Sequence, residues 1–412
     1  MLLRALWLVT WRSLEQHRLA GSITAFSIAL ATSLILTVSS LQFQAVKVFS
    51  GQTGGYDAVL GARGSSLQLV LCSLYHLENS PGNLSWDKVL AIRQEPLVSR
   101  AIPFALGDNY LGYRIVGTLS EYFSAWEPGF AFAQGGPFQA ESQAVVGSWV
   151  AQRTGLRLGD RFHPFHGLNY DAGAQHEESY QVVGILEPTN TPQDRVIFIP
   201  LEGVFRMSGH VLRGQGQEFV PRAGQPIPEA AQEVSGVLLK LKSPQAGMHL
   251  DQLINRQGHS ATLAWPIARI VSELFLRLEW LVQLMKLTTV LILVVAAASV
   301  SASLCNTLQE RRREFAILRA LGARRLFLSA VIGLESMLIT LLGTFGGFCL
   351  YLGLMWLVTR WLRFQTGIQF DPWALHPGLV AVPAGALALG FLSGLLPTML
   401  VYRRTLAPDL HG

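Results

Sequence analysis

The 412 residues are too apolar for an ordinary soluble enzyme. Half of them are hydrophobic, 14% are charged, and the mean hydropathy is +0.34, which together indicate a membrane protein with a sizeable water-soluble part. The net charge is +5, but no helix-turn-helix, zinc finger or aromatic-basic stripe accompanies it, and we therefore expect no nucleic-acid partner.

Four segments are apolar and long enough to cross a bilayer, which takes about 20 residues. They run approximately over residues 23–46, 284–304, 326–358 and 378–402. Ahead of the first, Trp7 and Trp11 stand four residues apart, on one face of a helix, and this spacing predicts an interfacial helix. The first apolar run is longer than a signal-peptide core and has no clean cleavage site, so we expect the segment to be retained.

These segments predict an α-helical membrane protein with four transmembrane helices and a large α+β extracytoplasmic domain between the first two. The expected order is an interfacial helix at 1–18, a span at 19–47, the extracytoplasmic domain at 48–278, a span at 279–305, a cytoplasmic coupling helix at 306–325, a span at 326–359, a short external loop at 360–377, a span at 378–402, and a cytoplasmic tail at 403–412.

The distribution of charge predicts the orientation. The N-terminal segment, the arginine-rich loop after the second span and the tail carry net charges of +2, +4 and +1, whereas residues 48–278 carry 17 basic and 20 acidic side chains. Positively charged loops stay in the cytoplasm. Both termini and the arginine-rich loop should therefore be cytoplasmic, with the large insertion outside.

The insertion shows a mixture of strand and helix patterns. Residues 144–147, 181–186, 195–200 and 234–241 are short apolar runs typical of strands. Ser148 to Thr154 is expected to form a short helix capped by Ser148 and ended by Gly155. Cys72 is the only cysteine of the insertion, so no disulfide can form within it and the domain must rely on its own core.

A histidine-rich stretch in the insertion is the main candidate for chemistry. His163 and His166 are three residues apart, and His176 and Glu177 follow after one loop, with Glu178 next to them. Imidazoles and a carboxylate brought together by a bend could supply three or four ligands to Zn²⁺. The alternative is a polar surface loop with ordinary histidines.

The loop between the second and third spans has the pattern of an amphipathic helix. Phe315, Leu318 and Leu321 recur at a spacing of three among charged residues, and Gly322 can end the helix in a left-handed conformation. An ordered apolar stripe among arginines favours a docking element for a cytoplasmic partner. The alternative is a solvated basic turn that only fixes topology.

The third and fourth spans contain small residues four apart and one buried acid. Gly343 with Gly347, and Gly390 with Gly394, allow close approach of helices, either within one bundle or at a dimer seam. Glu335 is expensive in lipid unless it faces protein or water. It is expected to be a structural hydrogen-bonding group, with a proton relay as the alternative.

The order of segments, the stretch "ERRREFAILRALGARR" and the ending "GLLPTMLVYRRTLAPDL" resemble the permease subunits of MacB/FtsX/LolC-type ABC transporters. Further similarity lies in "YDAVLGARGSSLQLVL", "AVVGSWVAQRTGLRLGDRF" and "YQVVGILEPTNTPQDRVIFIPLE", so the resemblance covers nearly the whole chain. The resemblance implies that the ATPase-coupling residues are Glu310, Arg311, Arg313, Glu314, Leu318, Arg319, Leu321 and Gly322.

The resemblance also implies a bacterial inner-membrane protein with a periplasmic domain, paired as a homodimer on cytoplasmic ABC ATPase subunits. ATP and Mg²⁺ would bind the partner, because these residues contain no G-x-x-x-x-G-K-[ST] loop. Membrane lipids and a periplasmic adaptor or binding protein are further expected partners. No hydrolase motif is present, so we expect no catalytic residues. The alternative is a membrane-anchored periplasmic sensor or scaffold that ATP does not drive.

Overall fold

The computed structural model describes residues 2–16, 18–51, 53–167, 170–222, 225–310, 317, 325–366 and 370–403. The chain divides into two compact units, and each is described by itself. The helical unit comprises Met1–Ala45, Leu278–Trp361 and Phe370–Gly412, and the second unit comprises Val46–Arg277 and Leu362–Gln369.

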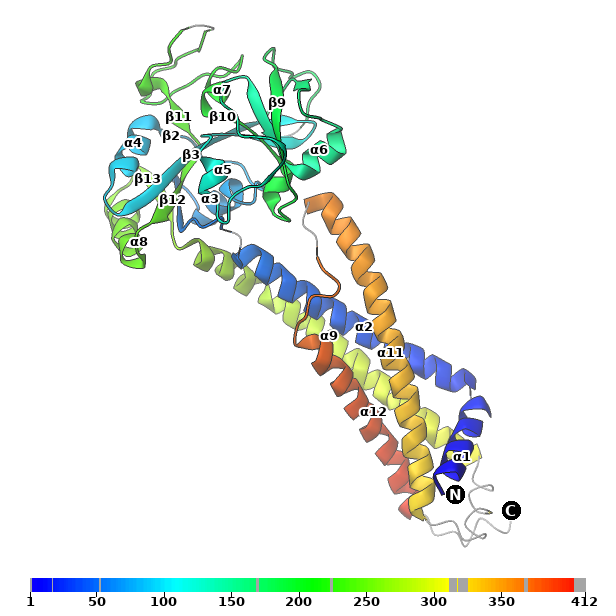
Figure 1. Cartoon of the computed structure of the whole chain (residues 1–412). Coiled ribbons are helices and arrows are strands. Elements are labelled where there is room, and N and C mark those ends of the chain that lie inside the picture. Colours follow the sequence, from blue (N-terminus) through cyan, green and yellow to red (C-terminus); the bar gives the residue numbers. More distant parts are fainter. Residues whose placement is uncertain are drawn as a thin grey trace. The chain divides into compact units, whose positions relative to one another are not determined.

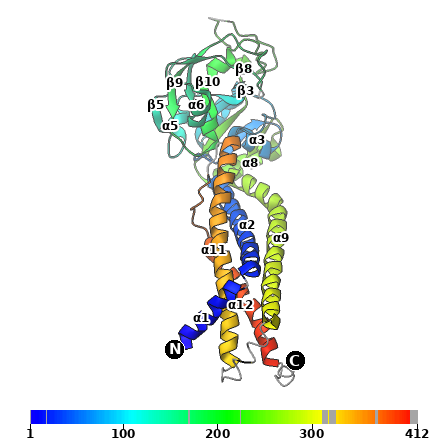
Figure 2. The same cartoon turned by 90° about the vertical axis from the view of Figure 1, so that its right-hand side faces the viewer.

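The helical unit is formed by long, apolar helices. They are α1 (Leu2–Gln16), α2 (Arg18–Gly51), α9 (Ile267–Glu310), α11 (Arg325–Thr366) and α12 (Gly378–Arg403), and the long ones run alongside one another (Figures 1 and 2). Each of the four predicted spans lies within one of these helices. Among the described residues, Gly21–Lys47 and Ser329–Phe364 are long and apolar enough to cross a membrane, and Gly378–Gly394 is a shorter apolar stretch. The number of four spans stays a prediction.

The second unit is a mixed α+β domain around one large sheet, which confirms the expected class of the insertion. The strand order is β13-β1-β12-β3-β4-β10-β6-β9-β5, with β7 paired to β9 and β8 paired to β3, and β11 pairs with β2 in a second sheet. The strands are β1 (Ala58–Ala62), β2 (Leu84–Ser85), β3 (Val98–Tyr110), β4 (Tyr113–Thr118), β5 (Phe132–Gly135), β6 (Gln143–Val146), β7 (Arg161–Phe162), β8 (Phe165–His166), β9 (Tyr180–Leu186), β10 (Val196–Pro200), β11 (Glu233–Val234), β12 (Gly236–Leu241) and β13 (Ala261–Ala264).

Both faces of the large sheet are buried. Successive residues of a strand point to opposite faces of the sheet, so one strand can contribute apolar side chains to both faces. In β3, Ile102 and Phe104 join one apolar cluster and Ala101 and Ala105 join the other. The helices that cover the sheet are α3 (Ser66–Ser73), α4 (Trp86–Gln94), α5 (Tyr122–Ala125), α6 (Ser148–Thr154), α7 (Leu201–Phe205) and α8 (Pro244–Asp251), with short helical turns at Pro192–Arg195, Glu229–Ala231 and Gln252–Gln257.

The expected strand segments are present, but one detail of capping differs. The helix expected at 148–154 is α6, and Gly155 ends it with a left-handed φ of 78°. Its N-cap is Gly147 rather than Ser148, and no side chain caps it. Ser148 was expected to be the cap from its type alone, yet it is already the first helical residue.

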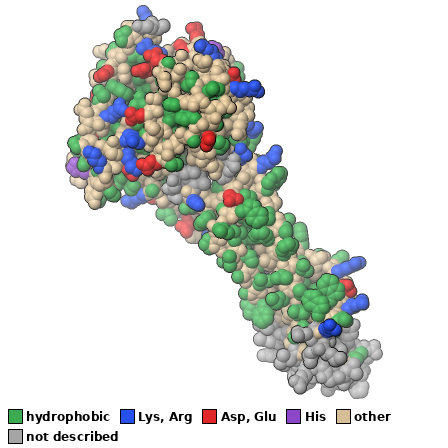
Figure 3. Space-filling view, viewed as in Figure 1, with side chains coloured by type: hydrophobic (Ala, Val, Ile, Leu, Met, Phe, Trp, Pro, Cys, Tyr) green, Lys and Arg blue, Asp and Glu red, His purple; other side chains and the backbone are tan. Residues whose placement is uncertain are grey.

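The two units differ in surface chemistry (Figure 3). On the face shown, hydrophobic side chains cover much of the described part of the helical unit, whereas charged side chains are spread over the α+β unit. This distribution is consistent with a lipid-facing bundle and a water-facing domain.

Candidate metal centre

Three imidazoles and one carboxylate converge in the α+β unit. One ligand atom from each of Asp108, His166, His176 and His210 lies within 4.8 Å of all the others. Asp108 Oδ1 is the common centre: it lies 3.5 Å from His166 Nδ1, 3.1 Å from His176 Nε2 and 3.2 Å from His210 Nε2.

A β-bulge presents Asp108 to this group. The pairing of β3 with β4 shifts register between Leu106 and Asp108, and Asp108 then pairs opposite His166 on the short strand β8. Bulges re-aim side chains and are common beside functional sites. The carboxylate thereby sits within a large sheet while it still reaches residues of the covering loops.

The chain reverses direction after β8 and brings His176 beside His166. The His166 amide donates to Ala174 O at 2.7 Å, and the His176 amide donates to Pro164 O at 2.9 Å. His163 does not join the group and its side chain is exposed. His163 stands three positions before His166, in the connection between β7 and β8, and it is not among the four residues whose ligand atoms converge.

His210 arrives from the segment after α7. Its amide donates to Met207 O at 3.2 Å, and the preceding Gly209 adopts a left-handed φ of 83°. A side chain is strained at such a φ, whereas glycine is not. This turn brings an imidazole to Asp108 from 102 residues further along the chain.

The sequence-based ligand set is therefore corrected. The structure brings together His166 and His176 but not His163 and Glu177, which are both exposed. Glu177 follows His176 directly, but the chain bends at this residue and its side chain is exposed. Sequence reasoning missed Asp108 and His210, because neither stands near the histidine-rich stretch and only the sheet topology brings them there.

Glu178 is not one of the four converging residues, but it binds the backbone and side chain of Ser208 next to them. The Glu178 carboxylate accepts hydrogen bonds from the Ser208 amide at 2.9 Å and from Ser208 Oγ at 3.0 Å. Ser208 O in turn accepts from His176 Nδ1 at 2.8 Å. Glu178 thus positions His176 through Ser208 and does not contact the ligand atoms themselves.

Two backbone carbonyls fix the tautomers of the inner histidines. His176 Nδ1 donates to Ser208 O at 2.8 Å, and His210 Nδ1 donates to Val204 O at 2.9 Å. A carbonyl oxygen can only accept, so Nδ1 carries the hydrogen in both rings. In the neutral rings both Nε2 lone pairs then point at the oxygen of Asp108.

Asp108 is the most buried member of the cluster, with 1% of its side chain exposed. Burial raises its pKa, but the hydrogen bonds and positive charge of His176 and His210 outweigh burial and bring the pKa to about 2. Burial lowers the pKa of His210, and the hydrogen bond to Asp108 with its negative charge raises it above the ordinary value. Asp108 Oδ2 is buried without a hydrogen-bond partner among the described residues.

The outer side of the cluster is open to solvent. The side chains of His176 and His210 are 4% and 14% exposed, whereas that of His166 is 60% exposed. A cavity of about 230 Å³ borders the site, and its lining includes His166, His210 and Ser235. A small ion could therefore reach the ligand atoms without opening the domain.

In the helical unit, the glycine pairs sit against neighbouring helices of the same chain. A Cβ added at Gly343 would lie 2.8 Å from Ala25 O of α2, and one at Gly347 would lie 2.8 Å from Ala29 O. On the other side of α11 the contact is with α12. A Cβ at Gly390 would clash with Thr340, and one at Gly394 would lie 3.0 Å from Ser336 Cβ.

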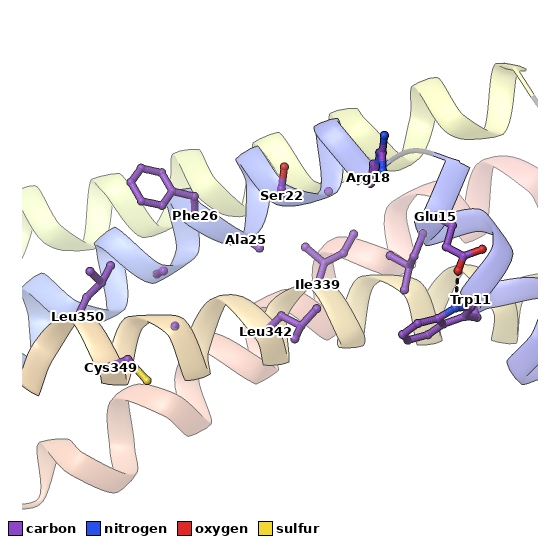
Figure 4. Close-up of a pocket in the computed structure, with 14 residues that line it drawn as sticks. Trp11, Glu15, Arg18, Ser22, Ala25, Phe26, Ile339, Leu342, Cys349 and Leu350 are labelled. Carbon is purple, nitrogen blue, oxygen red and sulfur yellow. Dashed lines mark hydrogen bonds between the residues drawn. The ribbon is translucent and has the colours of Figure 1, made fainter.

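Glu335 is 5% exposed, and Ser13 Oγ of α1 lies 3.0 Å from each of its carboxylate oxygens. This contact links α1 to α11, and the structural role of the acid stays a prediction. Nearby, an apolar groove of about 900 Å³ lies between α1, α2 and α11, with Glu15 and Arg18 at one end and Leu350 at the other (Figure 4).

The expected coupling residues cannot be placed in the same way. Glu310 ends α9, but its side chain is outside the described part. The other members of the set lie outside the described residues altogether: Arg311, Arg313, Glu314, Leu318, Arg319, Leu321 and Gly322. Their role therefore stays a prediction.

Comparison with known proteins gives one family match. The FtsX-like permease C-terminal family matches residues 286–406, the segment that holds the arginine-rich loop. A comparison with curated protein sequences gives no match.

Solved structures with distant similarity correspond to about half of the chain. The periplasmic region of MacB from Actinobacillus actinomycetemcomitans is 11% identical, with a TM-score of 0.33, over 54% of this chain and 94% of that one. The extracellular domain of the noncanonic ABC-type transporter YknZ from Gram-positive bacteria is 12% identical, with a TM-score of 0.31, over 50% of this chain and 99% of that one.

The family match falls on the part of the chain whose motifs carry the most specific resemblance. Residues 286–406 contain the end of α9, the arginine-rich loop, α11 and α12. Residues 286–406 are therefore similar to the C-terminal region of FtsX-like permeases, which confirms the predicted resemblance to MacB/FtsX/LolC-type ABC transporter permeases.

Proposed function

We propose that the chain is the permease subunit of an ABC transporter in which a separate cytoplasmic ATPase moves the extracytoplasmic domain. The observation that carries the proposal is the FtsX-like permease match over residues 286–406. The movement would serve export or mechanotransmission in the bacterial envelope, and residues 306–325 would receive the force.

The connections between helices and sheet support such a mechanism. α2 ends at Gly51, shortly before β1, and α9 begins at Ile267, directly after β13. β1 and β13 pair with each other, for example Leu60 opposite Leu263. A shift of α2 relative to α9 would therefore act on two hydrogen-bonded strands at one edge of the sheet.

α9 offers a direct path for force. It is one helix of 44 residues, a length of roughly 66 Å at 1.5 Å per residue. It leads from the strand β13 to Glu310, where the expected coupling segment begins. A push on that segment would thus reach the sheet through a single continuous helix.

The assembly would consist of two permeases and two ATPase subunits, with membrane lipids around the bundle. A periplasmic adaptor or binding protein would contact the extracytoplasmic domain. Two observations support the ATPase partner: the family match, and the absence of a phosphate-binding loop from the 412 residues.

The test combines copurification with ATPase measurements on membranes solubilised in gentle detergent. The full chain should bring down an ATPase subunit in equal amount and stimulate its ATP hydrolysis. Leu318→Asp or Glu314→Lys should abolish the stimulation, because a wrong charge or an unpaired polar group at a buried contact costs about 1–3 kcal/mol. Arg312→Gln, between the expected contact residues, is the matched control and should keep the stimulation.

The same experiment distinguishes the permease from the second function class. A membrane-anchored sensor or scaffold would be recovered without an ATPase, even in the presence of ATP. Stimulation that is unchanged in Leu318→Asp at normal expression would reject residues 306–325 as the coupling element.

A further inference from the structure

We propose that Asp108 Oδ1, His166 Nδ1, His176 Nε2 and His210 Nε2 bind one Zn²⁺ ion in an exchangeable four-ligand site on the extracytoplasmic domain. This site goes beyond the proposed ATPase coupling and does not depend on it. The ligands come from β3, β8 and two loops that lie far apart in the sequence.

The hydrogen bonds of the cluster require a positive charge at its centre. Because Ser208 O and Val204 O fix the hydrogen on Nδ1 of His176 and His210, neutral rings direct two Nε2 lone pairs at a buried carboxylate oxygen. Facing acceptors repel each other unless a cation lies between them. Protons on the rings or one metal ion can supply that charge.

The third imidazole favours the metal ion. His166 also turns a ring nitrogen to the same oxygen, at 3.5 Å, which is longer than a good hydrogen bond. In a tetrahedral zinc site with bonds of 2.0–2.1 Å, neighbouring ligand atoms are about 3.4 Å apart. The three distances from Asp108 Oδ1, from 3.1 to 3.5 Å, lie around that value.

The donor set selects the class of metal. Three imidazole nitrogens and one carboxylate oxygen suit Zn²⁺ among the common cellular ions, whereas Ca²⁺ and Mg²⁺ prefer oxygen ligands. The Nδ1–H bonds to backbone carbonyls are the outer contacts that metal-binding histidines typically make. Glu178 adds a further layer by holding Ser208.

The exposure of the ligands indicates exchange rather than permanent structural binding. Asp108 and His176 are buried and held, while His166 is 60% exposed beside the cavity of about 230 Å³. The ion can therefore enter and leave through the His166 side. When bound, it would tie the segment after α7 and the turn after β8 to the sheet.

The test is calorimetric titration of the full-length protein in detergent with ZnCl₂ after treatment with a chelator. The wild type should bind one equivalent of Zn²⁺. His166→Ala removes an exposed ring, so folding is not at risk, and should weaken binding by more than about 10-fold. Asp108→Asn and His176→Ala should weaken it by more than about 100-fold, since loss of an outer partner alone costs about 10–100-fold.

His163→Ala is the matched control. It removes an exposed histidine from the same histidine-rich stretch, outside the cluster, and should leave binding unchanged. Co²⁺ should give the intense visible absorption of a four-coordinate nitrogen and oxygen site in the wild type and in His163→Ala, but not in His166→Ala. Absence of zinc binding in the wild type, or equal affinity in His166→Ala and His163→Ala, would overturn the proposal.

Discussion

At His176 and His210 the backbone determines which ring nitrogen carries the hydrogen. The accepting carbonyls, Ser208 O and Val204 O, belong to α7 and the segment after it, which also carries His210. The orientation of both rings is therefore set by local folding. The ligand atoms are arranged before any ion binds, which lowers the cost of ordering side chains on binding.

Glu178→Gln should weaken zinc binding by about 10–100-fold, the usual cost of losing an outer partner of a metal ligand. The substitution replaces the carboxylate that accepts from the Ser208 amide and hydroxyl, so His176 loses its fixed acceptor position. Calorimetric titration with Zn²⁺ measures the change. Glu177→Gln, at the exposed neighbour, should have the wild-type affinity, and equal loss in both variants would contradict this role.

His76 should make the extracytoplasmic domain sensitive to acid. Burial lowers the pKa of His76 to about 4, and the charge of Arg114 acts in the same direction, against the hydrogen bond to Gln193. The unfolded value is about 6.5. The stability that depends on neutral His76 is therefore complete above about pH 6.5 and is lost as the pH falls toward 4, by roughly 1–2 kcal/mol at pH 5.

The check is urea unfolding of the full-length protein at pH 7 and pH 5. His76→Asn should reduce the loss of stability between these pH values, because the amide does not titrate and asparagine tolerates the positive φ of 53° at this position. His259→Asn, which removes an exposed imidazole, is the control. An unchanged pH dependence in His76→Asn would show that other groups cause it.

At this scale the sequence could predict only part of the candidate site. His166 and His176 are ten residues apart by number, and any turn between them brings them together. The register of β3 with β8 places Asp108 in the cluster, and the turn after α7 places His210 there. Neither feature leaves a local signal, because register depends on the pairing of distant strands.

At the level of elements, glycines set how closely the helices approach. Gly343 and Gly347 face Ala25 and Ala29 of α2, four residues apart on both helices. Small residues at this spacing let backbones come together and gain dispersion contacts, which drive association where lipid replaces water. The sequence shows the spacing of the glycines, but it does not show which helix packs against them.

Gly347→Leu should destabilise the helical unit by roughly 1–3 kcal/mol, the usual cost of overpacking. A Cβ at this position already lies 2.7 Å from Thr32 Cβ, so α2 and α11 must separate. Thermal unfolding in detergent, followed by the fraction of monodisperse protein, measures the effect. Gly353→Leu, on the same helix with nothing within 4 Å of its Cβ, should remain close to the wild type.

In the α+β unit, the sequence likewise predicts where strands form but not which strands pair. Apolar runs predicted strands over 181–186 and 195–200, and the structure forms β9 and β10 there. The two do not pair with each other, since β6 lies between them and pairs with both. Local pattern predicts a strand, whereas its neighbours depend on the packing of the whole sheet.

For the whole molecule, charge and connectivity point to one arrangement. The three predicted cytoplasmic segments are basic, and the insertion has 17 basic against 20 acidic residues. Because arginines are costly to move across a bilayer, we expect these segments on the cytoplasmic side. The strands that pair at the end of the sheet, β1 and β13, both connect to long helices. The candidate metal site would then face the periplasm and residues 306–325 the ATPase.

Cysteine labelling in intact cells tests this arrangement. With Cys305 and Cys349 replaced by alanine, the remaining Cys72 is buried and should not react. Gln217→Cys places a thiol at an exposed position of the α+β unit, and a membrane-impermeant reagent that reaches the periplasm should label it at once. Arg312→Cys should react only after the inner membrane is permeabilised, because its loop carries six arginines and should stay inside. Labelling of Arg312→Cys in intact cells would reverse the topology and remove the coupling segment from any cytoplasmic ATPase.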